Sequence, residues 1–260
     1  MIVRKDIQKL LVILERPIKQ TNKIMIENLD NYLVGIAIGV RFRANFAIED
    51  QLGTIIDQIL YSKNAYFNEQ VFKYTENHVN QKVLVDNETG DKLTINNSNI
   101  ILEINFSNKF GLKDLETVVK KFDSEIIENV LKKHKITQFV RVGYIKRYLF
   151  DMETLAKSFI RNTIGSTFEG VNDIDLRFSK KFPVSDSLLK KEIYDFDNVI
   201  FNIIKRADRE EIFMSLDYQK HFIPHLETTS GIEFQDFVDK VNNFSGKTYL
   251  NWLNKNYLKT

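Results

Sequence analysis

The sequence contains no cysteine among its 260 residues, and it has only three prolines, ten glycines and four histidines. The absence of cysteine excludes disulfides, a thiolate nucleophile and zinc or iron–sulfur centres held by cysteine. The few glycines and prolines leave little room for a flexible linker. No run approaches the roughly 20 apolar residues that cross a bilayer, and the N-terminus lacks the long apolar core of a signal peptide. We therefore expect a soluble, cytoplasmic protein with no membrane partner.

The composition is that of an ordinary globular protein, with 43% hydrophobic and 28% charged residues. The length predicts roughly two domains of about 150 residues each. Lysine and arginine together number 37 and the acidic residues 35, so the net charge is only +2. This balance does not favour polyanion binding by the whole molecule, and a nucleic-acid site would have to be a local patch.

Periodicity in the sequence predicts strands and helices in the same order in both halves of the chain. In the first half we expect strands over 34–46, 70–75, 83–85, 92–95 and 100–106, with helices over 49–61 and 112–134. In the second half we expect strands over 139–150, 174–178, 199–204 and 212–218, with helices over 152–164 and 232–257. The last helix should be broken near Ser245 and Gly246, and the segment 86–91 is typical of a hairpin turn.

The shared order indicates an internal duplication. An offset of 104 places Gly39 on Gly143, and the same offset places Arg43 on Arg147. An offset of 112 later places Ile100 on Ile212, which requires only insertions in loops. The alternative is that two halves of the same structural class share only their periodicity.

We expect an α+β fold in which two tandem strand–helix–strands–helix pseudo-repeats form a curved antiparallel sheet with helices on one face. The expected units are an N-terminal segment, 1–30, packing on the first repeat, a first repeat over 31–135 and a second repeat over 136–260. The element order resembles the tandem fold of the TATA-box-binding protein and its helix-grip relatives.

Two short motifs resemble a sporadically distributed bacterial family of proteins of unknown function. They are the strand Arg141-Val142-Gly143-Tyr144 and the later strand Met214-Ser215-Leu216-Asp217-Tyr218, which leads into a terminal helix. Ile145 stands where that family has a second arginine, and only one of its two acidic positions is evident in the later strand. The scattered distribution of the family implies a role in mobile-element or anti-phage defence biology, but the family has no established activity to carry over.

Side chains alternate across a strand, so the residues on the sheet face opposite the helices can be predicted. Six of them are basic: Arg41, Arg43, Lys73, Arg141, Arg147 and Arg177. Four polar or acidic residues share that face: Glu103, Asn105, Ser215 and Asp217. Arginine is well suited to phosphate and carboxylate, which predicts a surface for an anionic partner. The alternative is that these charges only pair across strands or protect the sheet edges.

Motifs for catalysis and for cofactors are missing. The sequence has no glycine-rich phosphate loop, no Gly-x-Ser-x-Gly and no His-Glu-x-x-His. The one histidine cluster, His221 to His225, contains Pro224, which argues against a continuous helix and favours a loop. We expect no cofactor and no metal.

The leading hypothesis is a non-enzymatic binding or adaptor protein whose open sheet face holds an anionic protein, nucleic acid or nucleotide. The alternative is a metal-dependent hydrolase or nuclease that uses Glu103 and Asp217 on the same face. Most aromatic residues fall on the buried phase, so we interpret them as core and not as a stacking platform for bases. The aromatic segment 247–258 is expected either to dock on the core or to form a homo-oligomer interface.

Overall fold

The computed structural model describes residues 25–61, 72–78, 81–106, 112–150, 162, 173–183, 195–206, 208–209 and 211–256. For 47, 72–78, 112–114 and 183 it describes the backbone but not the surroundings of the side chain. The predicted helix over 152–164 lies outside the described residues, apart from Asn162.

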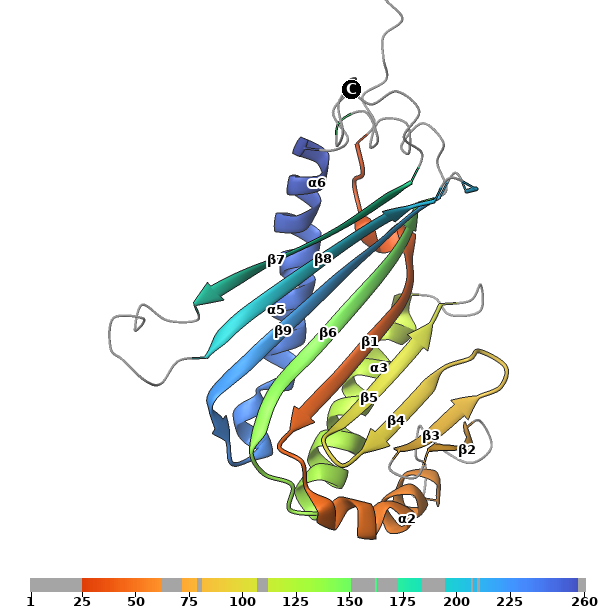
Figure 1. Cartoon of the computed structure of the whole chain (residues 1–260), viewed down its shortest axis with the longest axis vertical. Coiled ribbons are helices and arrows are strands. Elements are labelled where there is room, and N and C mark those ends of the chain that lie inside the picture. The colour runs from red at the N-terminus through yellow and green to blue at the C-terminus, as the bar shows by residue number, and fades with distance from the viewer. Residues whose placement is uncertain are drawn as a thin grey trace, which may run out of the picture.

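A single antiparallel sheet of nine strands forms the centre of the molecule (Figure 1). The strands are β1 (Leu33–Phe42), β2 (Phe72–His78), β3 (Gln81–Asp86), β4 (Lys92–Asn96), β5 (Asn99–Asn105), β6 (Phe139–Phe150), β7 (Ile174–Pro183), β8 (Phe196–Lys205) and β9 (Ile212–Leu226). Their order across the sheet is β2-β3-β4-β5-β1-β6-β9-β8-β7. The predicted α+β class with an antiparallel sheet is therefore confirmed.

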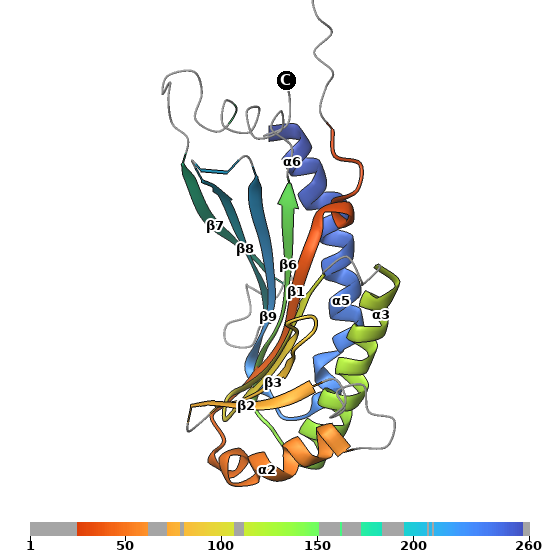
Figure 2. The same ribbon diagram turned by 90° about the vertical axis from the view of Figure 1, so that its right-hand side faces the viewer.

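The described helices lie on one side or at one end of this sheet, and none of them covers the other side (Figure 2). They are α2 (Phe46–Tyr61), α3 (Leu112–Lys121), α5 (Phe234–Asn243) and α6 (Leu250–Asn256). α3 continues into a π-helical stretch, η2 (Phe122–Leu131), and α5 joins α6 through a second one, η5 (Phe244–Tyr249). In Figure 1 the strands lie in front of α3, α5 and α6, so the viewer faces the open side of the sheet.

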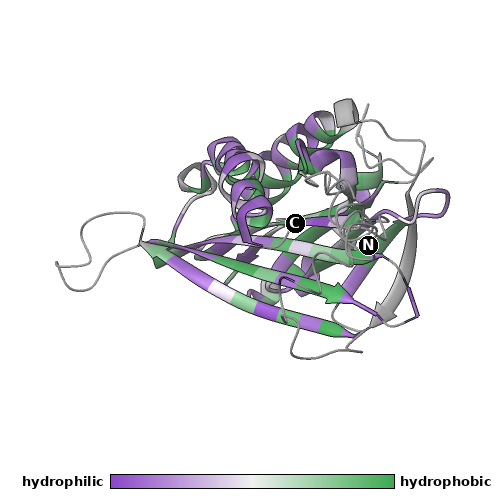
Figure 3. Cartoon of the chain, turned by 90° about the horizontal axis from the view of Figure 1, so that it is seen from above, coloured by the Kyte–Doolittle hydropathy of each residue, from purple (hydrophilic) through white to green (hydrophobic). Residues whose placement is uncertain are grey.

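The core lies between the sheet and the helices. Strand β6 shows why, because its even-numbered residues from Val142 to Phe150 are fully buried while its odd-numbered residues from Gly143 to Leu149 are partly exposed. The same alternation follows β4, β5 and β8. Hydrophobic and hydrophilic positions exchange along the strands in the foreground of Figure 3. The apolar stripe of α3 and η2 covers the buried phase with Val118, Phe122 and Ile126.

The hairpin predicted over 86–91 is confirmed and joins β3 to β4. The Asp86 carboxylate accepts hydrogen bonds from the backbone N–H groups of Glu88 and Thr89. Gly90 follows with φ at 76°, in the left-handed region that favours glycine.

The strand order is similar on both sides of the central β1–β6 pair. β5, β4, β3 and β2 follow outward from β1, while β9, β8 and β7 follow outward from β6. The ladders modify the alignment predicted from the sequence. Leu102 of β5 faces Ile38 of β1. The offsets of 104 and 112 align Ile38 with Val142 and Leu102 with Met214. Val142, however, faces Lys220 and not Met214. The duplication itself stays a prediction.

The described part of the N-terminal segment contacts the second half of the chain, although we expected it on the first repeat. The Asn254 amide of α6 pairs with the backbone N–H and C=O of Ile26, at 3.0 and 2.8 Å. The short 3₁₀ helix η1 (Leu29–Tyr32) follows, and the Tyr32 ring packs on Phe150 of β6. Residue 26 therefore lies beside α6.

The C-terminal aromatic segment docks on the sheet of its own chain. Leu253 is fully buried, and Trp252 packs on Phe178 and Phe201 of β7 and β8, at ring distances of 5.3 and 5.7 Å. The break predicted near Ser245 and Gly246 is wrong, because the helical backbone continues through this point as the π-helical stretch η5. None of the described helices is long and apolar enough to cross a membrane.

Candidate functional site

The open face of the sheet has a hollow at its centre, where β1 and β6 pair. Gly39 and Gly143 face each other there and contribute only backbone to the floor. The volume of the hollow is about 130 Å³. Its walls carry Ala37, Arg41, Asn99, Ile101, Arg141, Ile145, Asp217 and Gln219.

Close strand packing explains one glycine of this pair. A Cβ added to Gly39 would lie 2.9 Å from the carbonyl oxygen of Ile100 and 3.0 Å from the Ile101 side chain. At Gly143 the nearest atom to such a Cβ is the carbonyl oxygen of Tyr218, at 3.9 Å. Gly39 is therefore required by the backbone, whereas the space above Gly143 is open.

Two arginines stand side by side at one rim of the hollow. Arg41 and Arg141 are directly opposite each other in the β1–β6 ladder, and Arg41 is exposed while Arg141 is half-buried. Burial lowers the pKa of Arg141, the neighbouring charge of Arg41 lowers it further and Asp217 raises it. An arginine remains charged despite such shifts, so two like charges are held together here.

A polar chain connects Arg141 to the far side of the hollow. Arg141 donates to the Gln219 side-chain oxygen at 3.1 Å, and the Gln219 amide donates to Asp217 at 2.7 Å. Burial raises the pKa of Asp217, while the hydrogen bond from Gln219 and the charges of Arg141 and Arg177 lower it. Gln219 thus fixes the orientation of both charged groups.

His221 stands next to this chain, on β9. Its Nε2 lies 3.1 Å from the Gln219 side-chain oxygen, and its ring stacks on Phe196 at 4.6 Å. Burial lowers the pKa of His221, and the charge of Arg141 lowers it further, while Asp197 raises it. The sequence favoured a loop for His221 to His225, but β9 continues through this segment to Leu226.

The other predicted basic residues do not join Arg41 and Arg141. Arg147 forms an ion pair with Glu103 at 2.7 Å, and Arg177 lies near the sheet edge on β7. Arg43 follows the end of β1 and donates to the Gln138 side chain at 3.2 Å. Lys73 is on the edge strand β2, where the structure describes only the backbone. The predicted basic stripe is therefore one arginine pair with separate neighbours.

The repeat alignment grouped two of these pairs incorrectly. Arg43 was aligned with Arg147, but only Arg147 points from the sheet, opposite Gly35. The same offset of 104 aligns Lys73 with Arg177, but β2 is the fourth strand from β1 while β7 is the third from β6. Charges that match in sequence therefore occupy different places in the sheet.

The two carboxylates of the hydrolase alternative are far apart. Glu103 on β5 and Asp217 on β9 occupy the same row of the sheet, with Ala37 of β1 and Ile145 of β6 between them. Three strand spacings of about 4.8 Å separate their backbones by about 14 Å. One metal ion cannot be held by both, and the described residues include no group of three or more acidic or histidine side chains that would hold one.

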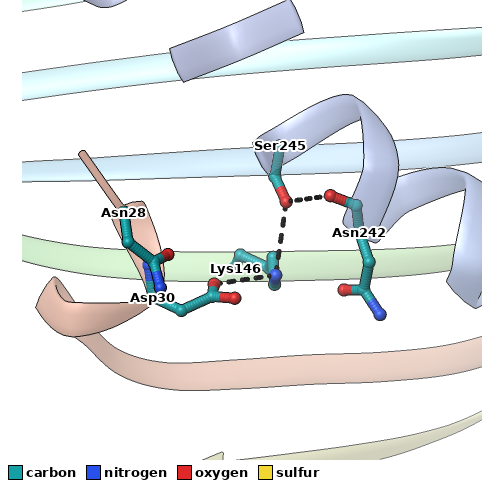
Figure 4. Close-up of polar contacts among 5 residues, drawn as sticks. All are labelled: Asn28, Asp30, Lys146, Asn242 and Ser245. Atoms are coloured by element: carbon teal, nitrogen blue, oxygen red, sulfur yellow. Dashed lines mark hydrogen bonds and ion pairs between the residues drawn. The ribbon is translucent and has the colours of Figure 1, made fainter. Parts of the chain in front are cut away.

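A buried lysine lies on the opposite side of the sheet and was missed in the sequence. Lys146 of β6 is 1% exposed and faces the helices, where its ammonium group donates to Asp30 at 3.0 Å and to Ser245 at 3.3 Å (Figure 4). Burial lowers the pKa of Lys146, while Asp30 raises it. The sequence did carry a signal for this burial. Lys146 has an even number, as Val142, Tyr144 and Tyr148 do, so it shares their face of the strand.

This lysine ties three separate segments together. Asp30 belongs to η1, capped by Asn28, and the Ser245 hydroxyl in turn donates to the Asn242 carbonyl at 3.0 Å (Figure 4). All partners of the ammonium group are thus elements of the fold, which makes Lys146 a structural residue.

The chain matches no family model and no curated protein sequence. The candidate site therefore has to be interpreted from its own residues.

Proposed function

We propose that this chain is a non-enzymatic binding protein that holds an anionic group of its ligand or partner at the Arg41–Arg141 pair. The observation that carries this proposal is the arginine pair itself. Two arginines directly opposite each other on neighbouring strands repel, which destabilises the sheet. A fold that keeps such a local conflict is typical of a functional site.

The two guanidinium groups are available to a ligand. Among the described residues, Arg41 forms neither an ion pair nor a side-chain hydrogen bond, and Arg141 uses one nitrogen for Gln219. Each guanidinium carries five N–H donors in a planar fork, which matches phosphate or carboxylate oxygens. An anion bound between them would also remove their mutual repulsion.

Isothermal titration calorimetry with inorganic pyrophosphate tests the proposal. We expect the double variant Arg41→Gln, Arg141→Gln to bind pyrophosphate at least tenfold more weakly, while its circular dichroism spectrum is unchanged. Arg147→Gln and Arg43→Gln serve as matched controls, because Glu103 and Gln138 already occupy those guanidinium groups. Both controls should keep their affinity within twofold.

Two results would overturn the proposal. One is unchanged affinity in the double variant. The other is an equal loss in both controls, because it would assign binding to diffuse positive charge and not to the pair.

A further inference from the structure

The hollow beside the arginine pair has room for one flat ring. An engineered apolar cavity of about 150 Å³ binds benzene, so a hollow of about 130 Å³ admits a group of that size. Gly39 and Gly143 provide a floor without side chains. Ile101 lies beside Gly39 on β5, and Ile145 lies two residues along β6 from Gly143. A bare anion would leave this apolar space unfilled.

The charged groups around the hollow lie at opposite ends of it. Arg41 and Arg141 are two residues along the strands from the glycine pair, which corresponds to about 7 Å. Asp217 lies on the other side of the glycine row, one strand beyond Ile145. The ligand that fits therefore has an anion at one end, a ring in the middle and hydrogen-bond donors at the other end.

We infer that the hollow binds a nucleotide, with its base over Gly39 and Gly143 and its phosphate between Arg41 and Arg141. This inference rests on the proposed function. The ribose provides the spacing between ring and phosphate, and the exocyclic amino group of cytosine, a base with a single ring, donates to the Asp217 carboxylate. An aryl carboxylate fits less well because its charge is attached directly to the ring, and an acidic peptide side chain has no ring.

The test compares ligands with and without the base. Calorimetry would use guanosine 5′-monophosphate, cytidine 5′-monophosphate and ribose 5-phosphate. We expect cytidine 5′-monophosphate to bind tenfold or more tightly than ribose 5-phosphate, because its single ring fills the hollow. Guanosine 5′-monophosphate, whose base has two rings, should bind more weakly than cytidine 5′-monophosphate.

Gly143→Ala provides the matching variant, because its methyl group enters the hollow without meeting an atom closer than 3.9 Å. We expect it to weaken nucleotide binding at least tenfold and to leave the affinity for ribose 5-phosphate within twofold. Gly246→Ala is the control, since a Cβ there meets nothing within 4 Å and η5 lies on the helical side of the sheet.

Failure of this inference can be distinguished from failure of the proposed function. If ribose 5-phosphate binds as tightly as both nucleotides and Gly143→Ala changes neither affinity, the inference fails and anion binding stands. If pyrophosphate, ribose 5-phosphate and the nucleotides all fail to bind, both are wrong.

The bound base has two sources, a free nucleotide or a single-stranded nucleic acid. A six-residue oligocytidylate that binds at least tenfold more tightly than cytidine 5′-monophosphate would identify a single strand. Equal affinities would identify the free nucleotide. In either case Gly143→Ala must weaken the binding.

Discussion

Gly39 and Gly143 face each other across β1 and β6, yet only Gly39 is packed against a neighbouring strand. An alanine Cβ at position 39 would lie 2.9 Å from the Ile100 carbonyl oxygen, a backbone atom that cannot move alone. We expect Gly39→Ala to lower the free energy of unfolding by about 1–3 kcal/mol, as overpacking typically does. Gly143→Ala should change it by less than about 1 kcal/mol. Urea unfolding of both variants checks this difference, and equal losses would contradict it.

Tyr144 and Tyr218 also face each other, across β6 and β9, and their hydroxyl groups differ in hydrogen bonding. The Tyr218 hydroxyl donates to the buried Asp197 carboxylate at 2.7 Å, whereas that of Tyr144 has no partner among the described residues. We expect Tyr218→Phe to cost about 1–3 kcal/mol, because the buried Asp197 carboxylate loses a hydrogen-bond donor and keeps only its ion pair with Lys240. Tyr144→Phe should be neutral or slightly stabilising. Thermal unfolding of the two variants side by side provides the measurement, and a larger loss for Tyr144→Phe would refute it.

Strict alternation allowed β6 to be predicted at its true bounds, 139–150. The same pattern was misleading at the end of β1, where it continued through Phe46. The strand ends at Phe42 because its pairing with both neighbouring strands stops there, at Asn99 of β5 and at Phe139 of β6. Arg43 consequently leaves the sheet, which periodicity alone cannot show.

The candidate site depended on register between distant strands. Alternation indicates that Arg41 and Arg141 share a face, but it does not indicate that they are directly opposite each other. The separation of Glu103 and Asp217 also follows only from the strand order, since β1 and β6 lie between β5 and β9. The sequence therefore predicted the open face of the sheet and most of its residues. The strand register determines which of these residues lie next to each other.

Lys146 and Asp30 form an ion pair, and we expect removal of Asp30 to destabilise the fold much more than removal of Lys146. Lys146 is 1% exposed and Asp30 is 38% exposed on their side chains. Asp30→Ala leaves a buried ammonium group without its counter-ion, and we expect a cost of about 2–4 kcal/mol. Lys146→Met keeps the volume, removes the buried charge and leaves Asp30 in contact with water, so its cost should be smaller by at least about 1 kcal/mol.

Urea unfolding of both variants tests this asymmetry. Lys132→Met is the control, because Lys132 forms an exposed ion pair with Glu128 on a helix surface. Its unfolding midpoint should not change. A larger loss for Lys146→Met than for Asp30→Ala would show that the lysine stabilises the fold by its charge.

Asp217 should make stability fall as the pH rises. Burial raises its pKa above the ordinary value of 3.8, so the folded chain holds this proton over a pH range in which the unfolded chain has already released it. The stabilisation is complete below pH 3.8 and is lost as the pH rises through the folded pKa. Asp217→Asn removes this loss, and the variant should be more stable than the parent chain at pH 7 and no more stable at about pH 3.5.

Urea unfolding at both pH values measures the effect, with Asp57→Asn as the control because Asp57 is exposed on α2. That control should show no difference between the two conditions. Lower stability of Asp217→Asn at pH 7 would mean that Arg141 and Arg177 outweigh burial at this carboxylate. A gain in stability together with weaker nucleotide binding would instead identify Asp217 as a residue kept for the ligand at the expense of the fold, as expected where a binding site conflicts with packing.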